Sequence, residues 1–171
     1  VGPAVATYTA ALISDTAVPA WHDGFRVMPF VFAASAVSSA AGLGLMAAPA
    51  AETGPVRLLG VAAGAAELAT EAVMERRMGI AQECFRVGKA KTYGRLARGL
   101  LVTGVVGTLL AGRRRAPAAL SGVCLLAGSA LTRWAIFEAG TASTLDPRYT
   151  VLPQRERLEQ RQGHEREGSH G

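Results

Sequence analysis

The chain has 171 residues, of which half are hydrophobic, 18% are charged and only 10 are aromatic. Small residues supply much of the apolar content, with 33 alanines and 20 glycines. This composition excludes a disordered chain, which needs low hydrophobicity and high charge, and a disulfide scaffold, which needs many cysteines. It also argues against an ordinary soluble helical domain, because the charges are bunched between long uncharged runs instead of being spread along every helix.

These uncharged runs predict the class of protein. They are 25, 14 and 17 residues long and lie at 27–51, 99–112 and 116–132. About 20 apolar residues cross a bilayer, and somewhat fewer suffice where Arg side chains at the ends reach the interface. A fourth segment, 58–74, is apolar except for Glu67 and Glu71, and the first, 1–14, is uncharged but short.

We therefore expect an all-α fold, a polytopic transmembrane bundle of about five hydrophobic helices followed by a polar tail. The predicted helices are 1–14, 29–48, 56–75, 96–112 and 117–139, so that residues 1–140 form the bundle and residues 141–171 the tail. Pro29 suits the start of a helix, and Pro49 and Pro55 mark a loop. Because the chain opens at Val1 within an apolar stretch, we expect its first helix to have lost residues and the chain to be part of a longer protein.

Five spans place the first loop, the third loop and the tail on the same side of the membrane. That side holds 13 of the 18 Lys and Arg residues, the other side holds 4, and Arg133 falls inside a helix. The positive-inside rule predicts that the first side is cytoplasmic, in a multi-pass protein of the plasma membrane. The net charge of +5 follows from this asymmetry, and no aromatic interleaving or motif indicates a nucleic-acid partner.

The third predicted helix carries the main candidate chemistry. Gly60, Gly64, Glu67 and Glu71 fall on one helical face, so the side suited to close packing also bears two carboxylates. An ionisable group in a membrane persists when it is paired or lines a polar path, unless the helix end lies near the interface. A rise of about 1.5 Å per residue puts Arg133 at a similar depth, so we expect Arg133 to pair with Glu67 or Glu71, as structural glue or in a proton path.

The first loop holds a second group of candidates. Asp15 and His22 form a titratable pair that could exchange protons near neutral pH, and Trp21 is typical of an interfacial anchor. Ordinary loop polarity is the alternative for both titratable residues. Most of the candidates fall in the same half of the membrane. The predicted quinone-binding or proton-path residues are Asp15, His22, Glu67, Glu71, Arg133 and Glu138.

Motifs for metals and for common catalytic sites are missing from the sequence. Cys84 and Cys124 form no C-x-x-C motif, and His22 is the only His outside the tail. The sequence therefore offers no zinc site, iron–sulfur cluster or pair of His ligands for a haem. It contains no P-loop, dinucleotide fingerprint or serine nucleophile elbow. If the protein handles electrons, its carrier must be a bound organic molecule.

Three stretches resemble one family. They are 8–23 (YTAALISDTAVPAWHD), 29–45 (PFVFAASAVSSAAGLGL) and 128–158 (GSALTRWAIFEAGTASTLDPRYTVLPQRERL). They are similar to the C-terminal half of the NrfD/PsrC family, the polysulfide-reductase-type membrane subunit, in its actinobacterial form. The more specific pieces are SDTAVPAWH and FEAG followed by DP-x-YTV-x-PQR. By its length, the chain would be about half of such a protein.

The resemblance implies a non-catalytic membrane subunit of an oxidoreductase complex. Such a subunit anchors a ferredoxin-like iron–sulfur subunit and a molybdopterin oxidoreductase subunit, and exchanges electrons with menaquinone or ubiquinone without a haem of its own. The best-known quinone contacts of the family lie in an N-terminal bundle that these stretches do not cover. A quinone role for the candidate residues is therefore our interpretation, and a proton path is the alternative. The competing classes are a membrane transporter or structural anchor with buried Glu/Arg pairs and, third, a soluble four-helix bundle.

Overall fold

The computed structural model describes residues 2–16, 18–49, 52–78, 82–112, 114–146, 148 and 151, and within these ranges it contains helices and no strand. The helices are α1 (Gly2–Ser14), α2 (Pro19–Asp23), α3 (Met28–Ala47), α4 (Thr53–Arg77), α5 (Gln82–Arg86), α6 (Gly88–Leu110) and α7 (Arg115–Leu145). The predicted all-α class is confirmed for this part of the chain.

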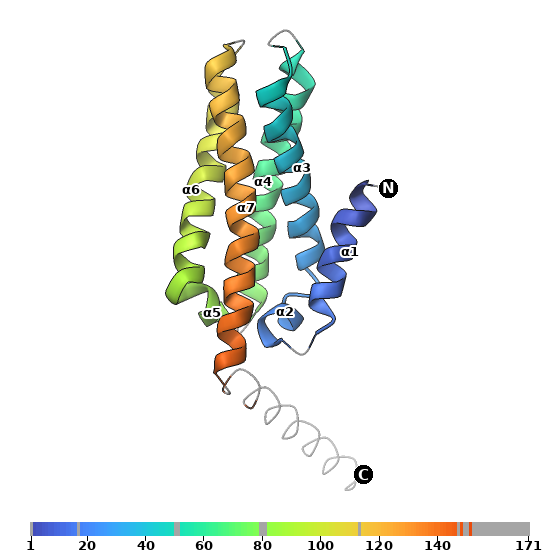
Figure 1. Ribbon diagram of the computed structural model, residues 1–171, viewed down its shortest axis with the longest axis vertical. Coiled ribbons are helices and arrows are strands. Elements are labelled where there is room, and N and C mark those ends of the chain that lie inside the picture. Colours follow the sequence, from blue (N-terminus) through green and yellow to red (C-terminus); the bar gives the residue numbers. More distant parts are fainter. Residues whose placement is uncertain are drawn as a thin grey trace, which may run out of the picture.

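Four long helices, α3, α4, α6 and α7, run side by side as an antiparallel bundle, and α1 packs against α3 at its edge (Figure 1). The short helices α2 and α5 lie at one end of the bundle, which we call the α2/α5 end. The last turns of α1, α4 and α7 also reach this end, whereas the α3–α4 and α6–α7 connections lie at the opposite end (Figure 1). The predicted alternation of chain direction is therefore confirmed for these helices.

The helix boundaries differ from the expected ones in two of the long helices. α6 begins at Gly88 instead of residue 96, and α7 continues to Leu145 instead of ending at 139, so 141–145 belong to the bundle and not to a tail. Lys and Arg are good helix formers, so a helix can continue through a basic segment where hydropathy predicts its end. Gly88 has a φ of +57°, which glycine adopts readily and which lets the chain turn between α5 and α6. The predicted tail beyond residue 151 lies outside the described residues.

Glycines allow α3, α4 and α7 to pack closely. A Cβ atom on Gly42 of α3 would lie 2.6 Å from the carbonyl oxygen of Gly122 on α7, and a Cβ atom on Gly122 would collide with the carbonyl of Gly42. On α4, Gly60 and Gly64 both face the side chain of Leu125, which is completely buried. The predicted small-residue face of α4 is therefore the face that packs inside the bundle.

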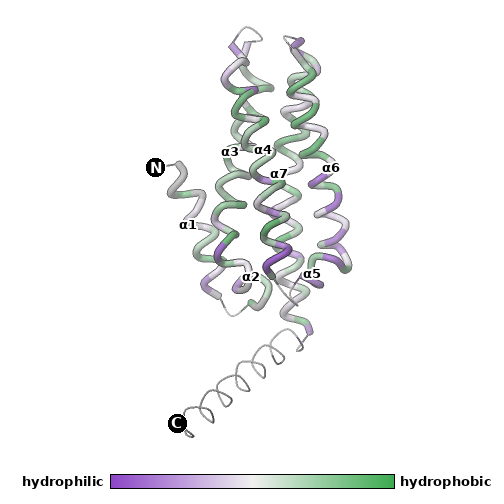
Figure 2. The backbone as a smooth tube through the Cα atoms, turned by 180° about the vertical axis from the view of Figure 1, so that it is seen from behind, coloured by the Kyte–Doolittle hydropathy of each residue, from purple (hydrophilic) through white to green (hydrophobic). Residues whose placement is uncertain are grey.

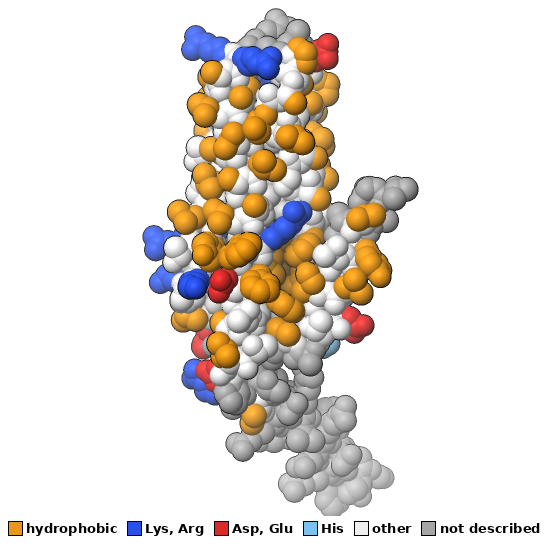
Figure 3. All heavy atoms as spheres, viewed as in Figure 1, with side chains coloured by type: hydrophobic (Ala, Val, Ile, Leu, Met, Phe, Trp, Pro, Cys, Tyr) orange, Lys and Arg blue, Asp and Glu red, His pale blue; other side chains and the backbone are white. Residues whose placement is uncertain are grey.

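Large apolar side chains cover the outside of the bundle, and small or polar residues occupy much of its interior. The exposed large side chains include Phe30, Leu43, Leu58, Leu110, Leu120 and Phe137. The buried polar residues include Ser35, Ser38, Thr108, Ser121, Ser129 and Thr132. Figure 2 shows many hydrophobic residues in the half of the bundle away from α2 and α5, and Figure 3 shows apolar side chains spread over the face in view. Large apolar residues such as Met28, Leu101 and Leu125 are buried as well, so the bundle is apolar on its outside and mixed in its interior.

By length and composition, α3 and α7 qualify as membrane spans, and no other described helix does. With 13 residues α1 is too short, while α4 and α6 contain both apolar stretches and clusters of charged residues. Core helices of soluble proteins meet the same criterion, so the arrangement with five spans stays a prediction.

Candidate functional site

Three glutamates follow one face of α4 and form the centre of the candidate site. Glu67, Glu71 and Glu75 are each four residues apart, which places successive carboxyl groups about one helical turn, roughly 6 Å, from each other. Their exposure decreases toward the middle of the bundle, since the side chain of Glu75 is 20% exposed, that of Glu71 is 6% exposed, and Glu67 is completely buried. We call this series the glutamate ladder. It leads from the α2/α5 end into the interior.

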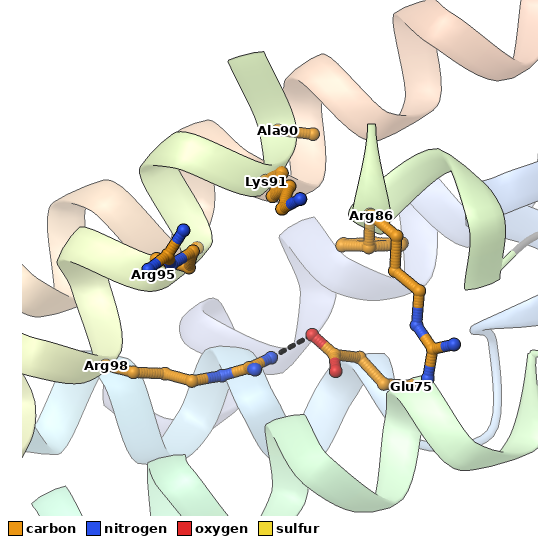
Figure 4. Close-up of a pocket in the computed structure, with 8 residues that line it drawn as sticks. Glu75, Arg86, Ala90, Lys91, Arg95 and Arg98 are labelled. Carbon is orange, nitrogen blue, oxygen red and sulfur yellow. Dashed lines mark hydrogen bonds and ion pairs between the residues drawn. The ribbon is translucent and has the colours of Figure 1, made fainter. Parts of the chain in front are cut away.

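Arg98 of α6 binds the two outer carboxylates of the ladder. Its Nε atom lies 3.4 Å from Oε2 of Glu71, and its Nη2 atom forms an ion pair with Oε1 of Glu75. Figure 4 shows the Arg98 side chain extending from α6 toward Glu75 on α4. A charged group inside a protein is tolerated when it is paired and hydrogen-bonded, so this arginine is what allows two adjacent carboxylates to remain on the inner face of α4.

Hydroxyl groups surround the innermost carboxyl group of the ladder. Ser129 Oγ on α7 donates a hydrogen bond to Glu67 Oε2 at 2.6 Å. The hydroxyls of Ser35 and Ser38 on α3 and of Thr132 on α7 lie near the same carboxyl group. We call these four residues the hydroxyl cluster. Glu67 Oε1 and Ser38 Oγ are buried and form no hydrogen bond among the described residues. A protonated carboxyl donates one hydrogen bond and a serine hydroxyl accepts one, so these groups can accommodate a proton on Glu67.

Leucine side chains close the bundle beyond the ladder. Leu45, Leu101 and Leu125 form a buried cluster contributed by α3, α6 and α7. Leu125 also contacts Gly64, which lies one turn of α4 beyond Glu67 in the direction away from the α2/α5 end. Because these side chains offer no hydrogen-bonding group, the polar series stops at the hydroxyl cluster.

The outer end of the ladder meets a positively charged cavity. Glu75 lines a cavity of about 310 Å³ between α4, α5 and α6. The charged residues around it are Glu75, Arg86, Lys91, Arg95 and Arg98 (Figure 4). Four of these five side chains are basic, so the approach to the ladder carries a positive potential.

The predicted partner of the glutamates is wrong. Arg133 forms no ion pair with Glu67 or Glu71, because its side chain is exposed and its guanidinium lies 5.8 Å from the centroid of the Phe32 ring. The rise along a helix predicts the depth of a residue but not the direction of its side chain. Arg133 follows the buried Thr132, and one residue along a helix turns the side chain by about 100°.

Sequence reasoning also misses Glu75, Arg98 and the hydroxyl cluster around Glu67. Glu75 continues the spacing of Glu67 and Glu71, so the same helical-face argument could have found it. Arg98 carries no such signal, since its pairing depends on how α6 is rotated and shifted against α4. In the sequence, Arg98 only marks the point where a long uncharged run begins.

The remaining predicted residues lie toward the α2/α5 end but outside the ladder. Asp15 follows α1 and is exposed, and His22 in α2 is exposed and stacks on Phe25 with 5.9 Å between the ring centroids. Glu138 on α7 is half-buried. Within the described ranges, none of these three candidates forms an ion pair. The structure therefore does not join them to Glu67 and Glu71.

The first loop docks on α7 through Trp21. The indole Nε1 donates a hydrogen bond to the carbonyl oxygen of Ile136 at 3.0 Å. The ring lies directly against Gly140, where any Cβ atom would collide with the indole. The structure shows Trp21 joining the SDTAVPAWH segment to α7, and its role as an interfacial anchor stays a prediction.

Neither a metal site nor a known relative assigns a function to this chain. Among the described residues, no group of three or more His, Cys, Asp or Glu side chains is placed to hold a metal ion. Comparisons with family models, with curated proteins and with solved structures give no match. The function therefore has to be argued from the glutamate ladder, Arg98 and the hydroxyl cluster.

Proposed function

We propose that this chain is an integral membrane subunit of a multi-subunit, quinone-linked oxidoreductase of the NrfD/PsrC type, and that its glutamate ladder conducts protons. The graded burial of Glu67, Glu71 and Glu75, with Arg98 bridging the outer two, is the observation that carries the proposal. Carboxyl groups inside a bilayer are costly and mark proton relays and ion pathways. The resemblance of three stretches to the NrfD/PsrC family supplies the context of the complex.

The proposed membrane spans are α3, α4, α6 and α7, together with α1, whose 13 residues extend over about 20 Å of the hydrocarbon core. The exposed large apolar side chains, together with the glycines and hydroxyl groups between the helices, suit a lipid environment, where helices associate through close packing and hydrogen bonds. The 25 residues of α4 and the 23 residues of α6 extend about 37 Å and about 34 Å, enough to cross a hydrocarbon core of about 30 Å. The excess of Lys and Arg toward the α2/α5 end supports a cytoplasmic location for this end.

Protons would reach the ladder from the cytoplasmic end. Glu75 is the most exposed of the three carboxylates, so it is the first to meet water. Arg98 contacts both Glu75 and Glu71, and a small shift of its guanidinium toward one of them weakens its attraction for the other, which can then accept a proton. Glu71 passes the proton one helical turn further to Glu67, where the hydroxyl cluster receives it.

The buried cluster of Leu45, Leu101 and Leu125 ends this route inside the bundle, so the proposed route crosses only part of the membrane. A proton on Glu67 returns to the cytoplasm unless α7 moves, because Leu125 and its neighbours block the way beyond. Ser129 and Leu125 lie one turn apart on α7, so a movement of α7 changes the hydrogen bond to Glu67 and the apolar seal together. In this proposal, electron transfer in the complex drives that movement.

The cavity beside Glu75 does not suit a quinone. A quinone ring and its isoprenoid tail need a mainly apolar pocket with a few well-placed polar groups, whereas four basic side chains line this cavity. We therefore assign proton transfer, and no quinone contact, to the residues of the ladder. In the proposed complex, menaquinone or ubiquinone, the ferredoxin-like iron–sulfur subunit and the molybdopterin oxidoreductase subunit contact other parts of the assembly.

Proton translocation by the complete complex in membrane vesicles, measured during quinol oxidation, tests the proposal. Glu67→Gln keeps the size of the side chain but removes its ionisation, so it should lower the number of protons translocated per quinol, and Glu71→Gln should do the same. Glu83→Gln makes the same change at an exposed position on α5 and should leave the ratio unchanged. A parental ratio in all three variants would rule out the ladder as the proton path.

A membrane transporter or a purely structural anchor is the second candidate. The Arg98 bridge itself favours an anchor, because an ion pair between α4 and α6 holds two helices together without any transport. An oxidoreductase subunit should retain iron–sulfur and molybdopterin partners in mild detergent and bind a quinol analogue, whereas an anchor or a transporter should not. Ion flux into liposomes that contain the chain without quinol would identify a transporter.

A further inference from the structure

The cavity at the α2/α5 end presents positive charge that the ladder does not neutralise. Arg86 of α5 and Lys91 and Arg95 of α6 line it together with Arg98 (Figure 4). Arg98 is held by its ion pair with Glu75, whereas no ion pair of Arg86, Lys91 or Arg95 occurs within the described residues. Three cationic side chains therefore surround a space of about 310 Å³. Of the described residues that line this space, Glu75 is the one that is acidic, and it is paired with Arg98.

An apolar stripe continues from this cavity along α6. Lys91 and Arg95 share one helical face with Val102, Val106 and Leu109, since all five fall within a narrow sector at 100° per residue. The side chains of these three apolar residues are about half exposed. Val106 lies eleven residues beyond Arg95, a rise of about 16 Å, which is close to half the thickness of a bilayer core of about 30 Å. The face thus combines a cationic end with an apolar length that matches one leaflet.

We propose that this cavity binds the phosphate group of an anionic phospholipid, whose acyl chain lies along Val102, Val106 and Leu109. Guanidinium groups such as those of Arg86 and Arg95 bind phosphate oxygens in a bidentate manner, and a lysine adds a point charge. Basic pockets between helices on the cytoplasmic side of a membrane are suited to lipid headgroups of this kind. The inference rests on the membrane location in the proposed function, but it does not depend on proton transfer through the ladder.

Free inorganic phosphate shares the headgroup's chemistry but accounts for less of the surface. It would neutralise Arg86, Lys91 and Arg95 and leave the exposed stripe on α6 without a role. A phospholipid covers both features at once. The lipid is therefore the occupant that the charge and the apolar stripe favour together.

Two triple variants with the same change in net charge test this site. The cavity triple carries Arg86→Gln, Lys91→Gln and Arg95→Gln. The control triple carries Arg76→Gln, Arg77→Gln and Lys89→Gln, at positions that are exposed near the same end and do not line the cavity. Because all six side chains are exposed, both triples should keep the helical circular dichroism of the parent.

Native mass spectrometry of the full chain in detergent, titrated with phosphatidylglycerol or phosphatidylcholine, measures the binding. We expect one tightly bound phosphatidylglycerol per chain, with phosphatidylcholine at least tenfold weaker. A cationic side chain near an anionic lipid contributes about fivefold to affinity, so the cavity triple should lose on the order of a hundredfold. The control triple should stay within a few-fold of the parent.

Several outcomes would overturn the inference. Equal losses in the two triples, no loss in the cavity triple, or equal binding of the two lipids would each show that the cavity is not a specific site. Displacement of phosphatidylglycerol by millimolar inorganic phosphate would assign the cavity to the free anion, whereas retention supports the lipid. Extraction of the chain from membranes by alkaline carbonate would instead contradict the membrane location, and so distinguishes failure of the proposed function from failure of this site.

Discussion

Trp21 and Ile136 are joined by a hydrogen bond of 3.0 Å although they lie 115 positions apart in the chain. The indole N–H of Trp21 donates to a backbone carbonyl of α7, seven residues after Ser129, or about 10 Å along the helix. Ser129 in turn donates to Glu67. The first loop and the innermost carboxyl of the ladder are therefore connected through one rigid stretch of α7.

Gly140→Ala should detach the first loop from α7. Any Cβ atom at this position collides with the Trp21 indole, and overpacking of this kind costs about 1–3 kcal/mol. The variant should unfold at a lower temperature in detergent, and proteases should cut the loop faster. Gly99→Ala is the matched control, because a Cβ atom there meets nothing within 4 Å and alanine favours a helix by about 1 kcal/mol. Equal stability of the two variants would contradict the docking of Trp21.

Arg98→Leu should destabilise the protein far more than Arg133→Leu. Removing Arg98 leaves the carboxylates of Glu71 and Glu75 without their partner, and we expect a loss of about 2–3 kcal/mol, between the values for exposed and buried ion pairs. The one interaction that the structure shows for the Arg133 guanidinium within the described residues is its contact with the Phe32 ring. Such a contact contributes about 0.5–1 kcal/mol at an exposed site. Chemical unfolding of both variants in mixed micelles measures the difference.

A double-mutant cycle shows whether Arg98 acts through Glu71. The variant Glu71→Gln with Arg98→Gln should be more stable than the sum of the two single changes predicts, because Arg98→Gln alone leaves the buried Glu71 carboxylate without its partner and Glu71→Gln removes that charge. The corresponding cycle between Glu71 and Arg133 should be additive. Additivity in both cycles would mean that the ion pair between Arg98 and Glu71 contributes nothing to stability.

Ser129→Ala should weaken the inner end of the ladder. The change removes the hydroxyl that donates to Glu67 Oε2, and a buried acceptor left without a donor costs about 1–3 kcal/mol. Ser121→Ala on the same helix removes a hydroxyl that bonds only to the carbonyl of Pro117 in the preceding turn and should change the melting temperature little. An equal effect of the two changes would show that the hydrogen bond to Glu67 does not stabilise the fold.

Gly42→Val should separate α3 from α7. A Cβ atom on Gly42 would lie 2.6 Å from the backbone carbonyl oxygen of Gly122. A backbone atom cannot relieve this clash by a rotamer change, as a flexible side chain could. We expect a severe loss of folded protein, read as the monodisperse fraction in size-exclusion chromatography after extraction. Gly54→Ala, at the start of α4 where a Cβ atom meets nothing within 4 Å, should behave like the parent.

Hydropathy and turn residues predicted most ends of the long helices to within a few residues, since these signals are local. The exceptions are the end of α7, which lies at Leu145 instead of residue 139, and the start of α6, where the basic residues from Lys89 to Arg98 continue the helix although the apolar run begins only after them. No pattern in the sequence predicts α5, because five residues are too few to show a helical period.

The sequence by itself determined the long helices, their alternating direction and the small-residue face of α4 that carries Glu67 and Glu71, because helical periodicity, chain breaks and side-chain size act over a few residues. The tertiary structure alone decided which groups meet those carboxylates. Arg98 and Ser129 reach them because of the rotation and shift of α6 and α7 against α4, and Arg133 is turned away by the same rotation. Such angles are set by the packing of glycines and leucines between helices, and no spacing along one helix specifies them.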